Sequence, residues 1–109
     1  MTRSLLDTRA LERVLEEFAD ARDWRRFHSP KNLAMALTGE VGELVEIFQW
    51  RTEEESWQLA SMPETAEHVR QELADVALYL VRLASVLGVD LDAAIRDKLV
   101  LNAQKYPAP

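Results

Sequence analysis

Residues 39–50, GEVGELVEIFQW, carry the pattern that decides how this chain folds. Apolar residues recur there at the three- and four-residue spacing of an α-helix. Glu40 and Glu43 interrupt the apolar pattern three residues apart, so a helix places them at neighbouring positions of one face. No basic residue lies within one helical turn of either glutamate. Ionised carboxylates in such surroundings are costly unless they are paired or bind a cation, so the segment predicts a helix with a chemical role.

Residues 71–81, QELADVALYLV, repeat the spacing with Glu72 and Asp75. If the two helices pack antiparallel, the two acidic pairs face each other and crowd four negative charges into one cleft. A divalent cation would relieve this repulsion, and hard oxygen ligands suit Mg²⁺ in particular. We therefore expect Glu40, Glu43, Glu72 and Asp75 to be metal ligands.

Simpler explanations exist for acidic pairs. A single E-x-x-E usually marks a solvated helix face, and Glu64 and Glu67, which share the spacing, are explained by the dipole at a helix start. A di-iron carboxylate bundle needs Glu-x-x-His, and neither His28 nor His68 has a glutamate three residues before it. No serine or cysteine signature supports a hydrolytic triad. Two pairs inside apolar segments are harder to dismiss than one.

The rest of the chain also predicts helices. Only three glycines and four prolines occur among 109 residues, and alternating strand patterns are absent from the sequence. The expected fold class is all-α, a bundle of about four helices per protomer assembled with a partner chain. We expect helices from the cap Asp7 or Thr8 to near Trp24, from Pro30 to about Trp50, from a capping box of Ser61 and Glu64 around Pro63 to Gly88, and from the cap Asp90 to before Pro107. A short helical piece is expected around Ser56–Ala60.

Composition bounds the function. The length fits one domain, residues 1–109, and so small a domain often buries more surface by oligomerising. A net charge of −6 opposes binding to polymeric nucleic acid or an anionic membrane. The chain has no cysteine, which excludes disulfides and thiolate sites, and no apolar run of membrane-spanning length. We expect a cytoplasmic protein that forms a homodimer or homotetramer.

The two acidic motifs, E-x-x-E and, further along the chain, E-x-x-D, resemble the signature of the MazG-like all-α nucleoside triphosphate pyrophosphohydrolases. Gly39 stands where many members have another glutamate, which is typical of the dCTP pyrophosphatase branch. Three segments carry the resemblance to that branch: RDWRRFHSPKNLAMALTGEVGELVEIFQW (22–50), QELADVALYLVRLA (71–84) and KLVLNAQKYP (98–107). Together these segments extend over almost the whole chain.

The resemblance implies a reaction and a site. It implies hydrolysis between the α and β phosphates to a monophosphate and pyrophosphate, with Mg²⁺, or Mn²⁺ as a substitute ion, and a water nucleophile. Glu43 or Glu46 would be the general base. Substrate-binding residues would be Trp24, His28, Asn32, Trp50, Tyr79, Lys98, Asn102 and Lys105. For most of these, an ordinary core, interface or surface role is the competing interpretation.

We expect dCTP or a modified dCTP as the substrate and nucleotide-pool sanitation as the role. One alternative is the same chemistry on another nucleotide, such as dUTP or a damaged purine triphosphate. A second alternative is a non-catalytic helical module whose acidic pairs only border a groove for a protein partner.

Overall fold

The computed structural model describes residues 5–109, and every regular element among them is helical, which confirms the all-α fold class. The elements are α1 (Thr8–Ala21), the 3₁₀ helix η1 (Arg25–Phe27), α2 (Pro30–Phe48), α3 (Glu53–Ser56), α4 (Ala66–Leu87) and α5 (Leu91–Lys105). No helix in this described part is both long and apolar enough to cross a membrane.

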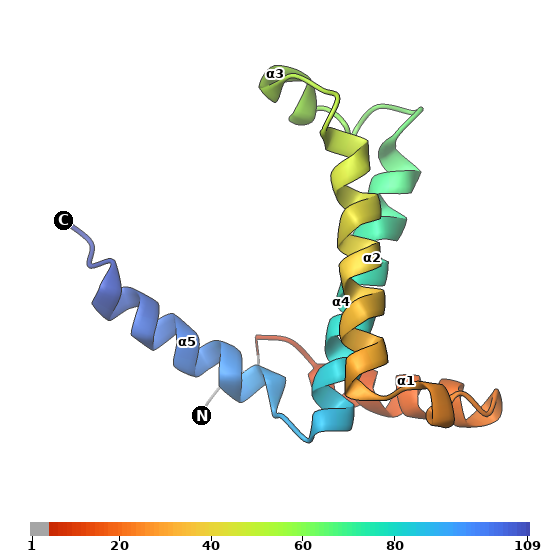
Figure 1. Ribbon diagram of the computed structural model, residues 1–109. Helices are drawn as coiled ribbons and strands as arrows, with labels where there is room; N and C mark the ends of the chain where they lie inside the picture. Colours follow the sequence, from red (N-terminus) through yellow and green to blue (C-terminus); the bar gives the residue numbers. More distant parts are fainter. Residues whose placement is uncertain (1–4) are drawn as a thin grey trace.

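The long helices α2 and α4 lie side by side and antiparallel, as the acidic pairs require (Figure 1). Helix α1 packs against α4 near the C-terminal end of that helix. The buried apolar side chains come mainly from these three helices and from the segment before α4; they are Ala19, Leu33, Leu59, Val69, Val81 and Ala84. Helices α2 and α4 make the most extensive helix–helix contact in the described part of the chain, although several apolar side chains of α2 stay exposed.

Three helices begin where their capping residues predict. Asp7, Ser29 and Asp90 each accept a hydrogen bond from the backbone N–H three residues later, at 3.0–3.1 Å. Each cap satisfies a donor that the first helical turn leaves unpaired. Helix α4 ends at Gly88, whose φ of 70° lies in the left-handed region that glycine adopts without strain.

The first two helices end earlier than the apolar pattern predicts. Helix α1 stops at Ala21 rather than near Trp24, because the chain turns at Asp23, which has a positive φ of 56°. The short helix η1 follows and leads directly into the Ser29 cap. Helix α2 stops at Phe48, two residues before the expected end.

In the connection between α2 and α4, the expected short helix is present but begins earlier, and the expected capping box is wrong. The short helix α3 overlaps the expected Ser56–Ala60 only at Ser56, because the reciprocal capping box of Thr52 and Glu55 starts it earlier. Ser61 and Glu64 do not cap α4, which begins after Thr65. The Thr65 hydroxyl instead donates to the Leu59 carbonyl at 2.6 Å and so ties the turn to a fully buried residue.

Helix α5 runs away from the α2–α4 pair, which makes the chain open (Figure 1). The radius of gyration is 16.7 Å, compared with about 13 Å for a compact domain of this length. Leu99, Val100 and Leu101 on this helix are each more than half exposed. The expected four-helix bundle is therefore not completed within one chain: α1, α2 and α4 pack together, and α5 does not.

Two glycine substitutions are expected to change stability in opposite directions. Gly88→Ala should lower the free energy of unfolding by about 1 kcal/mol, because alanine is strained at a positive φ. Gly42→Ala, in the interior of α2 with open space around the new methyl group, should raise it by about 0.5–1 kcal/mol. Urea unfolding followed by circular dichroism measures both, and equal shifts of the same sign would contradict the local conformations described.

Candidate active site

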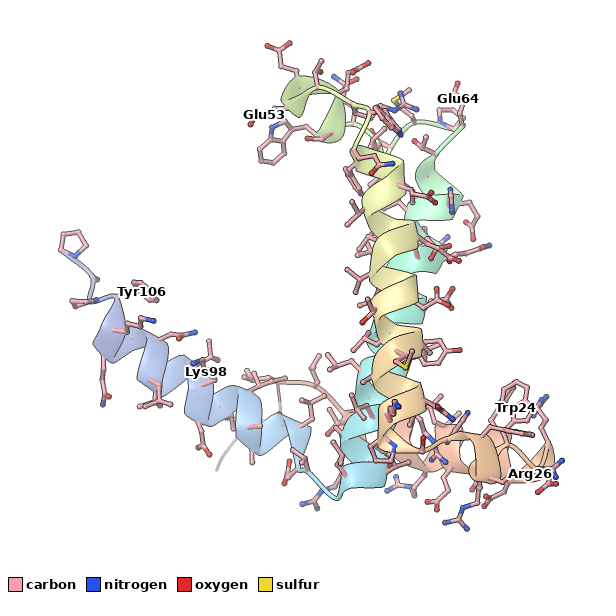
Figure 2. The ribbon with its side chains drawn as sticks, viewed as in Figure 1. Trp24, Arg26, Glu53, Glu64, Lys98 and Tyr106 are labelled. Atoms are coloured by element: carbon pink, nitrogen blue, oxygen red, sulfur yellow. The ribbon has the colours of Figure 1, made fainter. Side chains whose placement is uncertain are left out.

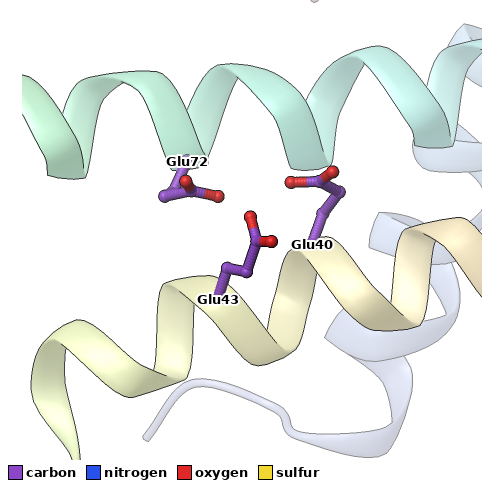
Figure 3. A group of neighbouring side chains, drawn as sticks. All are labelled: Glu40, Glu43 and Glu72. Atoms are coloured by element: carbon purple, nitrogen blue, oxygen red, sulfur yellow. The ribbon is translucent and has the colours of Figure 1, made fainter.

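Three carboxylates meet between α2 and α4. Glu40 and Glu43 project from α2 toward Glu72 on α4, as Figure 3 shows, and one oxygen of each lies within 4.8 Å of the others. We call these three residues the carboxylate cluster. Glu72 is buried, Glu40 is half-buried and Glu43 is exposed. The cluster has the residue type and the spacing that a hard divalent cation needs.

The cluster is poorly compensated by the protein itself. The Oε2 atoms of Glu40 and Glu72 are buried and have no hydrogen-bond partner. The nearest basic group within residues 5–109 is His68, whose Nε2 lies 3.4 Å from Glu72 Oε1. Buried carboxylate oxygens without partners are unfavourable, which favours an external cation as the missing partner.

The crowding changes the acidity of the cluster. Burial, together with the charges of Glu43 and Asp75, raises the pKa of Glu40 from 4.5 to about 7. Burial and the charge of Glu43 also raise the pKa of Glu72, against a smaller opposing effect from His68. At neutral pH Glu40 in the metal-free cluster is therefore partly protonated, and a bound cation would displace this proton.

Asp75 lies next to the cluster but outside its closest contacts. Its charge helps to raise the pKa of both Glu40 and Glu72, so it lies close to both. Asp75 also lines a pocket that begins beside the cluster. Glu46, one turn beyond Glu43 on α2, is exposed and is not one of the clustered carboxylates.

This pocket has a volume of about 200 Å³ and lies between α1, α2 and α4. Its lining is largely apolar and aromatic, with one carboxylate, one guanidinium and one imidazole. The lining residues are Leu15, Phe18, Ala19, Trp24, Leu33, Leu78 and Tyr79, together with His28, Asp75 and Arg82. We call it the aromatic pocket. A flat ring could stack in such a pocket while charged groups stay near Asp75 and the carboxylate cluster.

Side chains from three parts of the chain shape the aromatic pocket. The Trp24 ring makes an edge contact with Phe18 at 5.6 Å between centroids and a tilted contact with His28 at 6.1 Å. Arg82 on α4 donates from Nε to Nδ1 of His28 at 3.0 Å. This hydrogen bond ties the turn before α2 to α4.

The structure gathers some of the predicted substrate residues and separates others. Trp24, His28 and Tyr79 line the aromatic pocket. Asn32 does not line it, and its side chain donates to the Phe27 carbonyl. Trp50 is 85% exposed beyond the opposite end of α2.

The three predicted residues of α5 also lie away from the site. Lys98, Asn102 and Lys105 belong to the helix that leaves the α2–α4 pair, and Figure 2 labels Lys98 on that helix. Within one chain they do not approach the carboxylate cluster. They would have to reach a site in another copy of the chain.

Sequence reasoning missed several site residues, among them Phe18, His68, Leu78 and Arg82. Phe18 and Leu78 read as ordinary core positions of amphipathic helices. His68 lies four residues before Glu72, a spacing that pairs side chains on a helix and could have been noticed. Arg82 is the one charged residue in residues 76–87, VALYLVRLASVL, and that isolation was a usable signal.

Comparison with known proteins agrees with this geometry. Residues 36–109 match the model of the MazG-like family. The chain is 46% identical to human dCTP pyrophosphatase 1 over 98 residues, which is 90% of this chain and 58% of that protein. It is 45% identical to the bovine dCTP pyrophosphatase 1 over 97 residues, 89% of this chain and 57% of that protein. The chain thus spans somewhat more than half the length of these curated relatives.

A solved structure is also similar along the whole chain. The crystal structure of a pyrophosphatase from Archaeoglobus fulgidus superposes with a TM-score of 0.85 and is 36% identical. The alignment covers 99% of both chains. The open arrangement of the helices is therefore shared with a solved protein.

The raised pKa of Glu40 predicts how stability depends on pH. In the metal-free protein, folded Glu40 holds its proton up to about pH 7, whereas in the unfolded chain it loses the proton near pH 4.5. The folded state binds more protons between these values, so its stability should fall as pH rises from about 5 to about 8.

Thermal unfolding in a chelating buffer measures this effect. Glu40→Gln should raise the melting temperature by several degrees at the upper pH and flatten the pH dependence. Addition of Mg²⁺ should raise the melting temperature of the unmodified protein more at high pH than at low pH. A melting temperature of the metal-free protein that rises steadily over this range would contradict the described cluster.

Proposed function

Because the chain belongs to the MazG-like family, we propose that it is a Mg²⁺-dependent nucleoside triphosphate pyrophosphohydrolase. The proposed reaction uses one water molecule to hydrolyse the α–β phosphate bond of dCTP or a modified dCTP. The products are the nucleoside monophosphate and pyrophosphate. The proposed role is nucleotide-pool sanitation in the cytoplasm, with residues 1–109 acting as one domain.

One observation carries the proposal: the carboxylate cluster adjoins the aromatic pocket. Asp75 connects the two, because it lines the pocket and its charge acts on Glu40 of the cluster. A nucleotide has the same division, with a charged chain of phosphates at one end and a flat ring at the other. The printed names of the human and bovine relatives, dCTP pyrophosphatase 1, support the substrate and the reaction.

The residues present fit a divalent cation. The proposed ligands are Glu40, Glu43, Glu72 and Asp75. The Oε2 atoms of Glu40 and Glu72 have no hydrogen-bond partner in the protein and are free to coordinate a metal ion. Mg²⁺ suits an all-oxygen set that completes its coordination with water and phosphate oxygens, and Mn²⁺ could substitute. When bound, such an ion neutralises phosphate charge and lowers the pKa of a coordinated water.

The general base is proposed to be Glu43. It is the most exposed member of the carboxylate cluster, so a water molecule and the phosphates can approach it. Its carboxylate can accept the proton of the attacking water at the point where the phosphates are held. Glu46 is the weaker candidate, because it lies one turn farther along α2 and outside the cluster.

The nucleoside is proposed to bind in the aromatic pocket. Trp24 and Tyr79 offer ring faces for stacking, and His28 offers a polar group at the pocket wall. Asn32, Trp50, Lys98, Asn102 and Lys105 remain proposed substrate residues, which would act from another copy of the chain. The two lysines would then bring positive charge to the phosphates.

Self-association into a homodimer or homotetramer is part of the proposal. The chain leaves large apolar side chains exposed on α2 and α5, among them Met35, Val45, Val100 and Leu101. Exposed apolar surface on this scale is typical of protein interfaces. The net charge of −6 argues against polymeric nucleic acid and anionic membranes as partners.

Glu43→Gln should reduce the turnover number for dCTP by at least about 100-fold, because the amide cannot accept the proton of the water. The measurement is chromatographic analysis of dCMP and pyrophosphate from each common nucleoside triphosphate, with and without Mg²⁺. Glu54→Gln, an equal change of charge on exposed α3, is the matched control and should keep full activity.

The product pattern separates the alternatives. The same products from dUTP or a purine triphosphate would keep the chemistry and change the substrate. Full activity of a folded Glu43→Gln protein would remove this residue from the catalytic role. No hydrolysis of any nucleotide by the unmodified protein would favour a non-catalytic binding module.

Leu101→Asp should weaken self-association about 10- to 100-fold, because burying one large apolar side chain contributes about 1.5–3 kcal/mol. Sedimentation velocity across a concentration series measures the change. Gln104→Glu, an exposed polar position of the same helix, is the control. A monomeric unmodified protein at high concentration would contradict the proposed assembly.

A further inference from the structure

Arg82 is an unusual residue in the aromatic pocket. It is 6% exposed and lies in an otherwise apolar stretch of α4, yet it lines the pocket together with Trp24 and Tyr79. A buried guanidinium is costly unless its donors are satisfied. The proposed hydrolysis chemistry, as described above, gives this residue no task.

The guanidinium is only partly satisfied within the chain. Its Nε donates to Nδ1 of His28 at 3.0 Å, and this is its one hydrogen bond or ion pair with any residue from 5 to 109. A guanidinium is planar and carries five N–H donors, so the two terminal nitrogens keep theirs. Neither terminal nitrogen is among the fully buried side-chain atoms that lack a hydrogen-bond partner. Since neither has a partner in the chain, both keep some exposed surface.

His28 fixes the orientation of the Arg82 guanidinium. A ring nitrogen that accepts a hydrogen bond carries no proton, so the other nitrogen, Nε2, carries it. Burial and the charge of Arg82 lower the pKa of His28, which keeps the ring neutral. The imidazole therefore holds the Nε edge of Arg82 and leaves the end with the two terminal nitrogens for a ligand.

We infer that Arg82 is the specificity-determining residue of the aromatic pocket, where its terminal N–H groups donate to two adjacent acceptors on the edge of a nucleobase. The inference rests on the proposed function for the identity of the ligand as a nucleotide. It identifies the favoured base as one whose edge presents two neighbouring acceptors.

Among the pyrimidines this chemistry selects cytosine. Cytosine presents its O2 and N3 atoms side by side as acceptors, and a guanidinium fork can donate to both. Uracil and thymine carry a hydrogen on N3, which would oppose the N–H donors of Arg82. Substituents on C5 of cytosine lie away from this edge, so a 5-modified cytosine would bind equally well.

The position of Arg82 favours the base over the phosphates. Asp75, Tyr79 and Arg82 follow one another along the same face of α4, and all three line the pocket. Asp75 is at the end beside the carboxylate cluster, and Arg82 is two turns farther, among the aromatic side chains. A nucleotide whose phosphates lie at the cluster would extend its base toward Arg82.

The test measures dissociation constants of dCTP and dTTP by calorimetry in the presence of Mg²⁺, in the Glu43→Gln background if the unmodified protein hydrolyses them. With Arg82 intact, dCTP should bind about 5- to 150-fold more tightly than dTTP, which corresponds to one bidentate pair. Arg82→Met should reduce this ratio to near unity, mainly by weakening dCTP. Arg82→Lys, which keeps the charge but not the fork, should give an intermediate ratio.

Arg70→Met is the matched control, because it removes the same charge from an exposed position of the same helix. It should leave the ratio unchanged. A ligand change tests the inference without a mutation: the triphosphate of 3-deaza-deoxycytidine lacks the N3 acceptor and should bind the unmodified site at least about 5-fold more weakly than dCTP. Undiminished binding of this analogue would overturn the inference even if the Arg82 variants fail to fold.

Three results would overturn the inference: no preference for dCTP over dTTP, equal weakening of both nucleotides by Arg82→Met, or undiminished binding of the 3-deaza analogue. Equal weakening would assign Arg82 to phosphate binding or to the fold alone. The proposed function fails separately. A protein that binds dCTP selectively through Arg82 but forms no pyrophosphate would retain the inference and lose the reaction.

Discussion

Electrostatic repulsion between carboxylates on two packed helices is the constraint on which this structure depends. Apolar packing of α2 against α4 brings Glu40 and Glu43 to Glu72, and the same packing buries oxygen atoms that have no partner. The apolar contacts must therefore outweigh the cost of the acidic group. Protonation of Glu40 near neutral pH reduces that cost without a metal ion, and a cation would remove more of it. Stability and chemistry are thus opposed at one place in the fold.

The open shape divides the chain into two parts with different tasks. Helices α1, α2 and α4 build the carboxylate cluster and the aromatic pocket within one chain. Helix α5 contributes to neither, and its apolar side chains Leu99, Val100 and Leu101 are exposed. The solved pyrophosphatase from Archaeoglobus fulgidus has a similar arrangement over its full length, so the open shape belongs to the fold.

Local signals made most of the fold predictable from the sequence. The caps Asp7, Ser29 and Asp90 and the closing glycine Gly88 act through neighbouring backbone groups, so their effects are visible in a few residues of sequence. The predicted start of α4 was wrong, because the Thr65 hydroxyl donates a hydrogen bond to the carbonyl of Leu59, six residues away, instead of capping the helix. The orientation of α5 relative to α2 and α4 was not predictable either, since a local sequence pattern does not determine the direction of a helix after a turn.

Site residues that are close together in the sequence were predictable, and those that meet only through the tertiary fold were not. Acidic pairs three residues apart indicate one helix face, which predicted that all four proposed ligands meet, and three of them form the close group in the structure. Trp50 and Lys98 came from resemblance alone, and the single chain does not bring them to the pocket. Arg82 was missed because its partner, His28, is 54 residues away, and only the packed structure shows the contact.

Helix α4 also fixes a length. Asp75 and Arg82 are seven residues apart, which a helix converts into a rise of about 10 Å. The covalent structure of a nucleotide also fixes the distance between its phosphates and the edge of its base. The rigid helix therefore selects ligands in which this distance matches the separation of Asp75 and Arg82. One inserted or deleted residue between these two positions would rotate one end by about 100° relative to the other. Mutational drift can therefore replace side chains along this segment but cannot change its length.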